Sequence, residues 1–131
     1  MHTDYLNELR QLIDFGLVVL LWLVQQIIYP SFSQIAPERL VEWHAHYTQR
    51  VGYIVVPLMF GQLGLSVLAV WQVGDSLDWL DLFLVLSCWG LTLGFSVPLH
   101  QQIAAGKSQP QVLQQLVVTN WPRTLVWTLV F

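Results

Sequence analysis

The feature that most limits the possible folds of this chain is a series of long apolar segments joined by short polar links. The segments cover residues 12–29, 51–73, 77–99 and 113–131. An α-helix needs about 20 mostly apolar residues to cross the hydrocarbon core of a bilayer. Because a chain in lipid must satisfy its backbone hydrogen bonds internally, each segment is predicted to form a membrane-spanning helix.

The composition agrees with a membrane location. Charged residues make up 10% of the chain, whereas soluble domains carry about 25%. The seven tryptophans suit a protein with two membrane–water interfaces, where Trp collects. A net charge of −3 argues against nucleic acid as a partner, because such a surface must be basic. We therefore expect one integral membrane domain, residues 1–131, in contact with the lipid bilayer.

The polar stretch of residues 37–50 is predicted to belong to the same helix as the second span. Pro37 suits the first turn of a helix, where its missing N–H would be unpaired anyway. Pro57 should bend this helix, because an interior proline removes a backbone hydrogen bond. Short links favour antiparallel neighbours. The predicted fold is thus all-α: an up-down-up-down four-helix transmembrane bundle whose second helix extends beyond the membrane at its N-terminal end.

Basic residues in the links predict the orientation of the bundle, because Lys and Arg collect on the cytoplasmic side. Arg39, Arg50 and Lys107 belong to one side of the predicted bundle, and Arg10 belongs to the other. We therefore expect a multi-pass protein of the cell membrane with its histidine-bearing side in the cytoplasm and both termini outside.

The fourth segment is the least apolar and leaves two interpretations open. It contains Gln114, Gln115, Asn120 and Arg123. It either spans the membrane or forms an interfacial helix that breaks at Pro122.

Polar residues are predicted to gather at the cytoplasmic side. His46, Arg50 and Tyr53 follow helical spacing and share one face. His44 lies about 200° from His46 around the helix, so the two cannot both point inward. The sequence favours His46, whose face continues to Arg50 and Tyr53. The complete set expected to form a polar ligand-binding pocket is His46, Arg50, Tyr53, His100, Asn120, Arg123 and Tyr29.

Several functions agree with such a pocket. His46 and His100 come from different helices and could hold a metal ion or a haem, since paired histidines ligate haem iron. The pocket could equally bind a polar ligand, or the histidines could simply lie at the membrane interface. Gly90 and Gly94 form a G-x-x-x-G motif that permits close helix packing. That packing is expected within the bundle, or against a second copy or another membrane subunit, which would make the chain a structural subunit.

Motifs along most of the chain carry a resemblance. They read F-x-x-I-x-P from Phe32, W-H-x-H-Y-x-x-R from Trp43, V-P-L-M from Val56, V-P-L-H-x-x-I-A-A-G from Val97 and T-N-W-x-R-T-x-x-W from Thr119. In these motifs the chain resembles a group of small uncharacterised bacterial four-helix membrane proteins. The resemblance implies the fold and no particular activity.

A second set of residues is similar to the small four-helix bacterial protoporphyrinogen oxidases. Arg50, Pro57 and Met59 match the Arg and P-x-M of that family's second span, and Asn120 and Pro122 match the N-x-P that opens its last span. This similarity implies a small membrane oxidoreductase that acts on a lipophilic substrate. The histidine in that family's first span has no counterpart in residues 12–29.

Overall fold

The computed structural model of the protein describes residues 2–107 and 109–131, which form helices and no strand. They build four helical rods. The first rod joins α1 (His2–Leu23), η1 (Val24–Ile28), α2 (Tyr29–Ser31) and η2 (Phe32–Gln34). The second rod is α3 (Pro37–Gln72), and the third joins α4 (Ser76–Leu91), η3 (Thr92–Ser96) and α5 (Val97–Ala104). The fourth rod is α6 (Pro110–Val130). An all-α chain of four helices is confirmed.

Local sequence explains where the rods begin and end. Pro37 occupies the first turn of α3, as predicted. Gly74 ends that helix with a φ of 67°, a left-handed conformation that glycine adopts without strain. Asp75 then caps α4 by accepting a hydrogen bond from the Asp78 N–H at 2.9 Å, and the Asp78 side chain accepts in return from the Asp75 N–H. The Asp78 carboxylate in the first turn also suits the positive end of the helix dipole.

Two π-helical turns interrupt the first and third rods, and a proline explains each. Pro30 lies two residues after η1, and Pro98 lies two residues after η3. A proline has no N–H to donate four residues back, so the preceding turn can widen to the π pattern. The N–H of Tyr29 accordingly bonds Val24 O, and the N–H of Val97 bonds Thr92 O.

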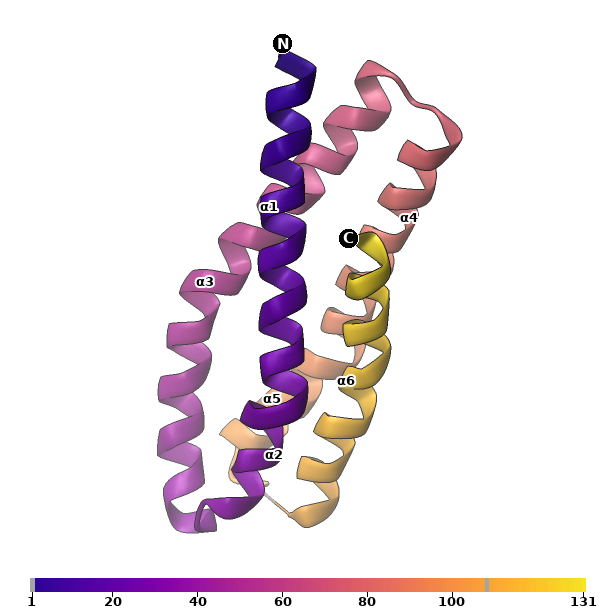
Figure 1. Cartoon of the computed structure of the whole chain (residues 1–131). Coiled ribbons are helices and arrows are strands. Elements are labelled where there is room, and N and C mark those ends of the chain that lie inside the picture. The colour runs from indigo at the N-terminus through magenta and orange to yellow at the C-terminus, as the bar shows by residue number, and fades with distance from the viewer. Residues whose placement is uncertain (1, 108) are drawn as a thin grey trace.

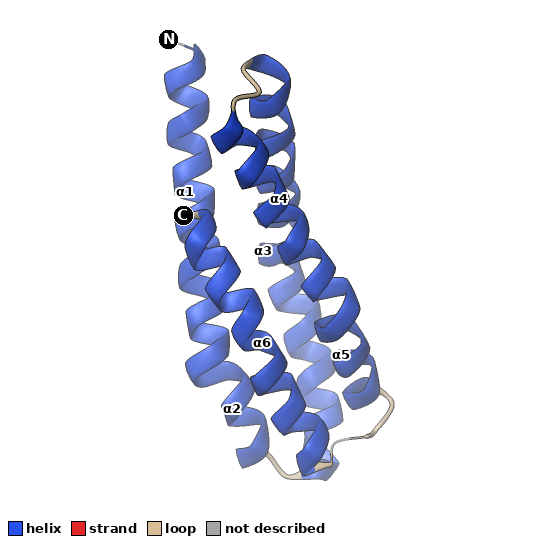
Figure 2. Ribbon diagram, turned by 90° about the vertical axis from the view of Figure 1, so that its right-hand side faces the viewer, coloured by secondary structure: helices blue, strands red, loops and turns tan. Residues whose placement is uncertain are grey.

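The rods pack side by side as a bundle (Figures 1 and 2). α3 packs against α1 and α4, and α6 also packs against α1 and α4. The links that follow η2 and α5 lie at one end of the bundle, and the turn between α3 and α4 lies at the other (Figure 1). α3 contains Pro57 and changes direction along its length, which agrees with the predicted bend.

The core has two parts. One surrounds Phe32, Leu40 and Ile103, each at most 1% exposed, near the end where α3 begins. The other is built around Leu17 and Trp127, both fully buried. Between and beside these apolar groups lie the buried polar side chains described below.

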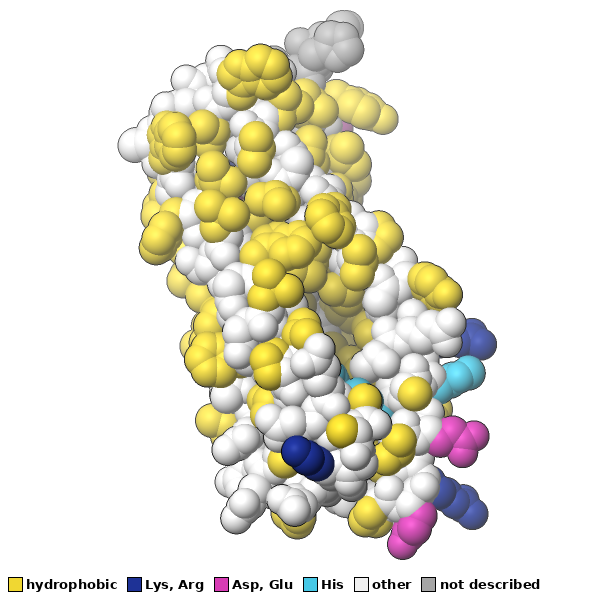
Figure 3. Space-filling view, turned by 180° about the vertical axis from the view of Figure 1, so that it is seen from behind, with side chains coloured by type: hydrophobic (Ala, Val, Ile, Leu, Met, Phe, Trp, Pro, Cys, Tyr) yellow, Lys and Arg dark blue, Asp and Glu magenta, His cyan; other side chains and the backbone are white. Residues whose placement is uncertain are grey.

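The outer surface is apolar over most of its height. Within the described residues, three helices are long and apolar enough to cross a membrane: Asp4–Gln34, Pro37–Gln72 and Ser76–Ala104. Hydrophobic side chains cover much of the face in Figure 3, whereas charged side chains gather near the end where α3 begins. These features support a membrane location. α6 is not among the three. It runs without interruption through Pro122, so of the two interpretations the one with a break there is wrong.

Candidate functional site

The inward face of α3 is the stripe that contains His44. His44 is 1% exposed, whereas His46 lies on the exposed side of the same helix. The stripe begins at Leu40 and continues through Tyr47 and Val55 to Met59, all buried or half-buried. The expectation that His46 points inward is therefore wrong. Arg50 and Tyr53 lie with His46 on the outer face of α3, where the Arg side chain can reach water and a Tyr side chain suits the membrane interface.

Three side chains from three rods form a hydrogen-bonded chain, which we call the His44–His100–Tyr29 chain. The Nε2 atom of His44 lies 2.7 Å from Nδ1 of His100, and the two rings stack with centroids 4.9 Å apart. The Nε2 atom of His100 lies 2.8 Å from the Tyr29 hydroxyl. Tyr29 follows the π turn of η1 directly, and His100 lies four residues after η3. The π turns therefore help to set the directions of both side chains.

A second group of polar contacts surrounds Arg123 of α6. Its Nη1 donates to Ser96 Oγ at 2.8 Å and to Asn120 Oδ1 at 2.9 Å. The Asn120 amide donates in turn to Gln25 Oε1 at 3.0 Å. Arg123 is 6% exposed, and its Nε has no hydrogen-bond partner among the described residues. The contacts hold the guanidinium in place through neutral groups only.

Both groups border one cavity of about 360 Å³. Its lining includes Tyr29, His44, His100, Ser96 and Arg123, together with aliphatic side chains from the first three rods. Figure 3 shows histidine side chains recessed between the helices on the face drawn there. The cavity therefore has a mainly apolar wall that includes a few polar groups, which is the usual character of a small-molecule site.

The residues predicted for the site divide into two groups. Four face the interior of the bundle: Tyr29, His100, Asn120 and Arg123. Three lie on the outer surface of α3: His46, Arg50 and Tyr53. The structure does not bring the predicted metal or haem ligands, His46 and His100, together, because His100 faces His44 on the opposite side of α3. Within the described residues no cluster of three or more His, Cys, Asp or Glu is arranged to hold a metal ion.

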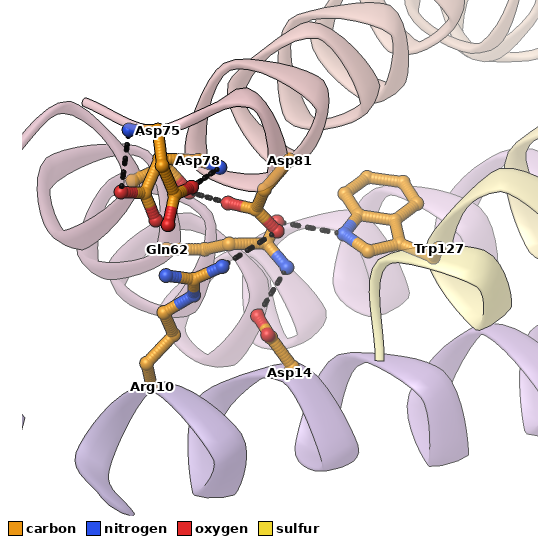
Figure 4. A network of polar contacts seen from close by, with 8 residues as sticks. Arg10, Asp14, Gln62, Asp75, Asp78, Asp81 and Trp127 are labelled. Atoms are coloured by element: carbon orange, nitrogen blue, oxygen red, sulfur yellow. Dashed lines mark hydrogen bonds and ion pairs between the residues drawn. The ribbon is translucent and has the colours of Figure 1, made fainter. Parts of the chain in front are cut away.

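A further polar network lies on the other side of Trp127, and the sequence alone did not predict it (Figure 4). The Trp127 indole donates to Gln62 Oε1 at 2.9 Å, and the Gln62 amide donates to Asp14 Oδ1 at 2.7 Å. Asp14 and Gln62 are 4% and 1% exposed. A lone polar residue in an apolar helix usually faces the bundle interior. That rule, applied to Asp14 and Gln62, would have found this network.

An ion pair completes this network. Arg10 Nη2 lies 3.0 Å from Asp81 Oδ1, and Ser66 donates to the other oxygen of Asp81 at 2.6 Å. Trp127 joins the two polar regions, because the Arg123 guanidinium lies 5.3 Å from the centre of its ring. A cation over an indole face is attracted to it.

The G-x-x-x-G motif does not pack within the bundle. Gly90 and Gly94 lie on the exposed side of the third rod, and a Cβ added to either would meet no atom within 4 Å among the described residues. The expected packing inside the bundle is wrong. Packing of this face against a second chain stays a prediction.

Comparison with known protein families, with curated proteins and with solved structures finds no match to this chain. The two resemblances noted in the sequence, and the oxidoreductase activity that one of them implies, stay predictions.

Proposed function

We propose that this chain is an integral membrane protein that binds an amphiphilic molecule, with the anionic head group of the ligand held at Arg123 and its apolar body in the adjoining cavity. The four helices cross the bilayer in alternating directions. The His44 end faces the cytoplasm, and both termini lie outside. Three apolar helices and the larger number of basic residues near the His44 end support this arrangement.

The length of α3 agrees with a helix that extends out of the membrane. Its 36 residues correspond to about 54 Å at ~1.5 Å per residue, against about 30 Å for the hydrocarbon core. Its first turns carry the exposed Glu38, Arg39 and Glu42. These side chains need water, which supports a position of the cavity beside the membrane interface. In the proposed orientation an amphiphile of the cytoplasmic leaflet could reach it.

The observation that carries the binding proposal is the lack of a countercharge for Arg123. The single ion pair in the described structure joins Arg10 and Asp81, and the partners of Arg123 are a hydroxyl and an amide. A buried charge without an opposite charge is costly. A carboxylate or a similar anion in the cavity would supply that charge and would accept hydrogen bonds from the guanidinium.

The experiment uses the protein purified in detergent and cis-parinaric acid, a fatty acid that fluoresces when it binds. Wild-type protein is expected to bind this anion at least tenfold more tightly than its uncharged methyl ester. Arg123→Gln should remove most of that difference, because the amide keeps hydrogen-bonding capacity but has no charge. A tenfold change corresponds to about 1.4 kcal/mol.

Arg50→Gln is the matched control, because Arg50 belongs to the same end of the bundle but is exposed. It should leave both affinities within about twofold of wild type. Equal binding of the acid and its ester by the wild-type protein would contradict an anion site at Arg123.

A further inference from the structure

The His44–His100–Tyr29 chain ends differently on its two sides. Tyr29, at one end, lines the cavity that His100, His44 and Arg123 also line. At the other end, the Nδ1 atom of His44 is buried without a hydrogen-bond partner in the described part of the chain. All three residues of the chain therefore border the cavity, and the closed end of the chain is the single buried Nδ1 atom of His44.

Two hydrogen-bond directions are compatible with neutral imidazole rings. If Tyr29 O–H donates to His100 Nε2, then His100 Nδ1–H donates to His44 Nε2, and both rings carry their proton on Nδ1. If the direction is reversed, both rings carry it on Nε2. Each ring nitrogen has only one role in each case, because a neutral imidazole has one donor and one acceptor.

Arg123 favours the first direction. It is the charged side chain that lines the same cavity as Tyr29 and His100. A cation beside the hydroxyl favours oxygen lone pairs that face it and an O–H that points away, toward His100. The unpaired His44 N–H opposes this direction, and the electrostatic attraction between the guanidinium and the hydroxyl oxygen favours it.

We propose that the His44–His100–Tyr29 chain is a proton relay that takes a proton from a ligand in the cavity and places it on His44. The proposal rests on the proposed function, because the ligand must first bind at Arg123. It adds a substrate class: an amphiphile whose head group has a weakly acidic O–H, such as a phenol or an enol.

The transfer balances in three steps. The ligand O–H bond breaks and its proton moves to the Tyr29 oxygen, while the Tyr29 proton moves to His100 Nε2. The proton on His100 Nδ1 moves to His44 Nε2, so that His100 ends neutral and His44 ends as an imidazolium. The electron pair stays on the ligand oxygen, whose new negative charge pairs with Arg123. The relay therefore leaves the positive charge on the His44 ring, two hydrogen bonds away from Tyr29.

The first test reads the tautomers by nitrogen-15 NMR of the protein in lipid nanodiscs, with labelled histidine. His2→Gln and His46→Gln together leave His44 and His100 as the only labelled rings. In the ligand-free protein both rings are expected to carry their proton on Nδ1. Protons on Nε2 in both rings would overturn the assigned direction.

The second test compares two probes. 4-Dodecyl-2-nitrophenol brings a proton into the site and absorbs visibly once ionised, whereas parinarate enters already ionised. With the nitrophenol, the two ring nitrogens of His44 should converge to the shared shift of an imidazolium as nitrophenolate absorbance appears. With parinarate His44 should stay neutral. Nitrophenolate formation while His44 stays neutral would overturn the relay.

Tyr29→Phe removes the first link with little change of shape and should abolish the imidazolium signal of His44. The signal should persist in Arg50→Gln, whose exposed side chain is outside the chain of hydrogen bonds. An imidazolium signal that survives Tyr29→Phe would also overturn the relay. If the wild-type protein fails to bind parinarate at all, the proposed function fails, whereas parinarate binding without proton transfer to His44 rejects the relay alone.

Discussion

Two histidines that are two residues apart have opposite roles in this molecule. His44 stacks on His100 and contacts Phe32 in the interior, and His46 lies on the exposed side of α3. The angle of about 200° between their side chains makes this separation unavoidable on a regular helix. Only one of them can therefore take part in the site.

This difference predicts unequal effects of the same substitution. His44→Ala leaves a void and removes the partner of His100 Nδ1, and a buried polar atom left unpaired costs about 1–3 kcal/mol. His46→Ala removes an exposed side chain and should change stability by no more than about 0.5 kcal/mol. Thermal unfolding in detergent, followed by circular dichroism, measures both. A larger loss for His46→Ala would contradict the assigned orientation of α3.

At the scale of elements, the two π turns give the site its geometry. η1 and η3 each end two residues before a proline, on the two rods that supply Tyr29 and His100. An extra residue in a helical turn rotates everything that follows, by about 100° relative to a continuous α-helix. The prolines therefore influence where the site side chains point without contacting a ligand.

The turn between α3 and α4 yields a second test of the structure. Gly74 has a φ of 67°, and a Cβ added there would lie 2.7 Å from the carbonyl oxygen of Val70. Gly106 has a φ of 86°, but its added Cβ would meet no described atom within 4 Å. The left-handed conformation alone costs a non-glycine residue about 1–2 kcal/mol.

Gly106→Ala should therefore destabilise the protein by about that amount, and Gly74→Ala should destabilise it more, because its Cβ also collides with backbone. The thermal midpoints of the two variants in the same detergent provide the comparison. An equal or smaller effect at Gly74 would show that the turn can relax and that the collision is absent in solution.

At the scale of the whole molecule, polar side chains fill much of the interior and apolar side chains cover much of the outside. Trp127 connects the two buried polar regions, since it donates to Gln62 on one side and lies beneath Arg123 on the other. This distribution suits a lipid environment, in which polar groups must find partners within the protein.

The proposed orientation in the membrane can be tested with introduced cysteines. The native Cys88 is fully buried, so a membrane-impermeant maleimide should label only new sites. In intact cells Val73→Cys, in the turn between α3 and α4, should be labelled. Ser33→Cys, at the opposite end, should be labelled only after the membrane is permeabilised. The reverse pattern would invert the orientation, and labelling of both in intact cells would argue against a membrane-spanning bundle.

The sequence by itself determined the helical architecture of this protein. Apolar segments of membrane length, Pro37, Gly74 and the acidic residues after it place the rods, because these signals are local. It also identified Tyr29, His100, Asn120 and Arg123 as interior residues, since polar groups at those depths need partners inside the bundle.

Only the tertiary structure decided which face of α3 points inward. Over a few turns, the stripe of His46, Arg50 and Tyr53 and the stripe of His44 and Tyr47 are equally regular. The choice depends on what the neighbouring rods present, and His100 and Phe32 are distant in sequence from α3. The contacts of Gln62 with Asp14 and Trp127 likewise join three rods, and periodicity along one helix carries no information about its partners.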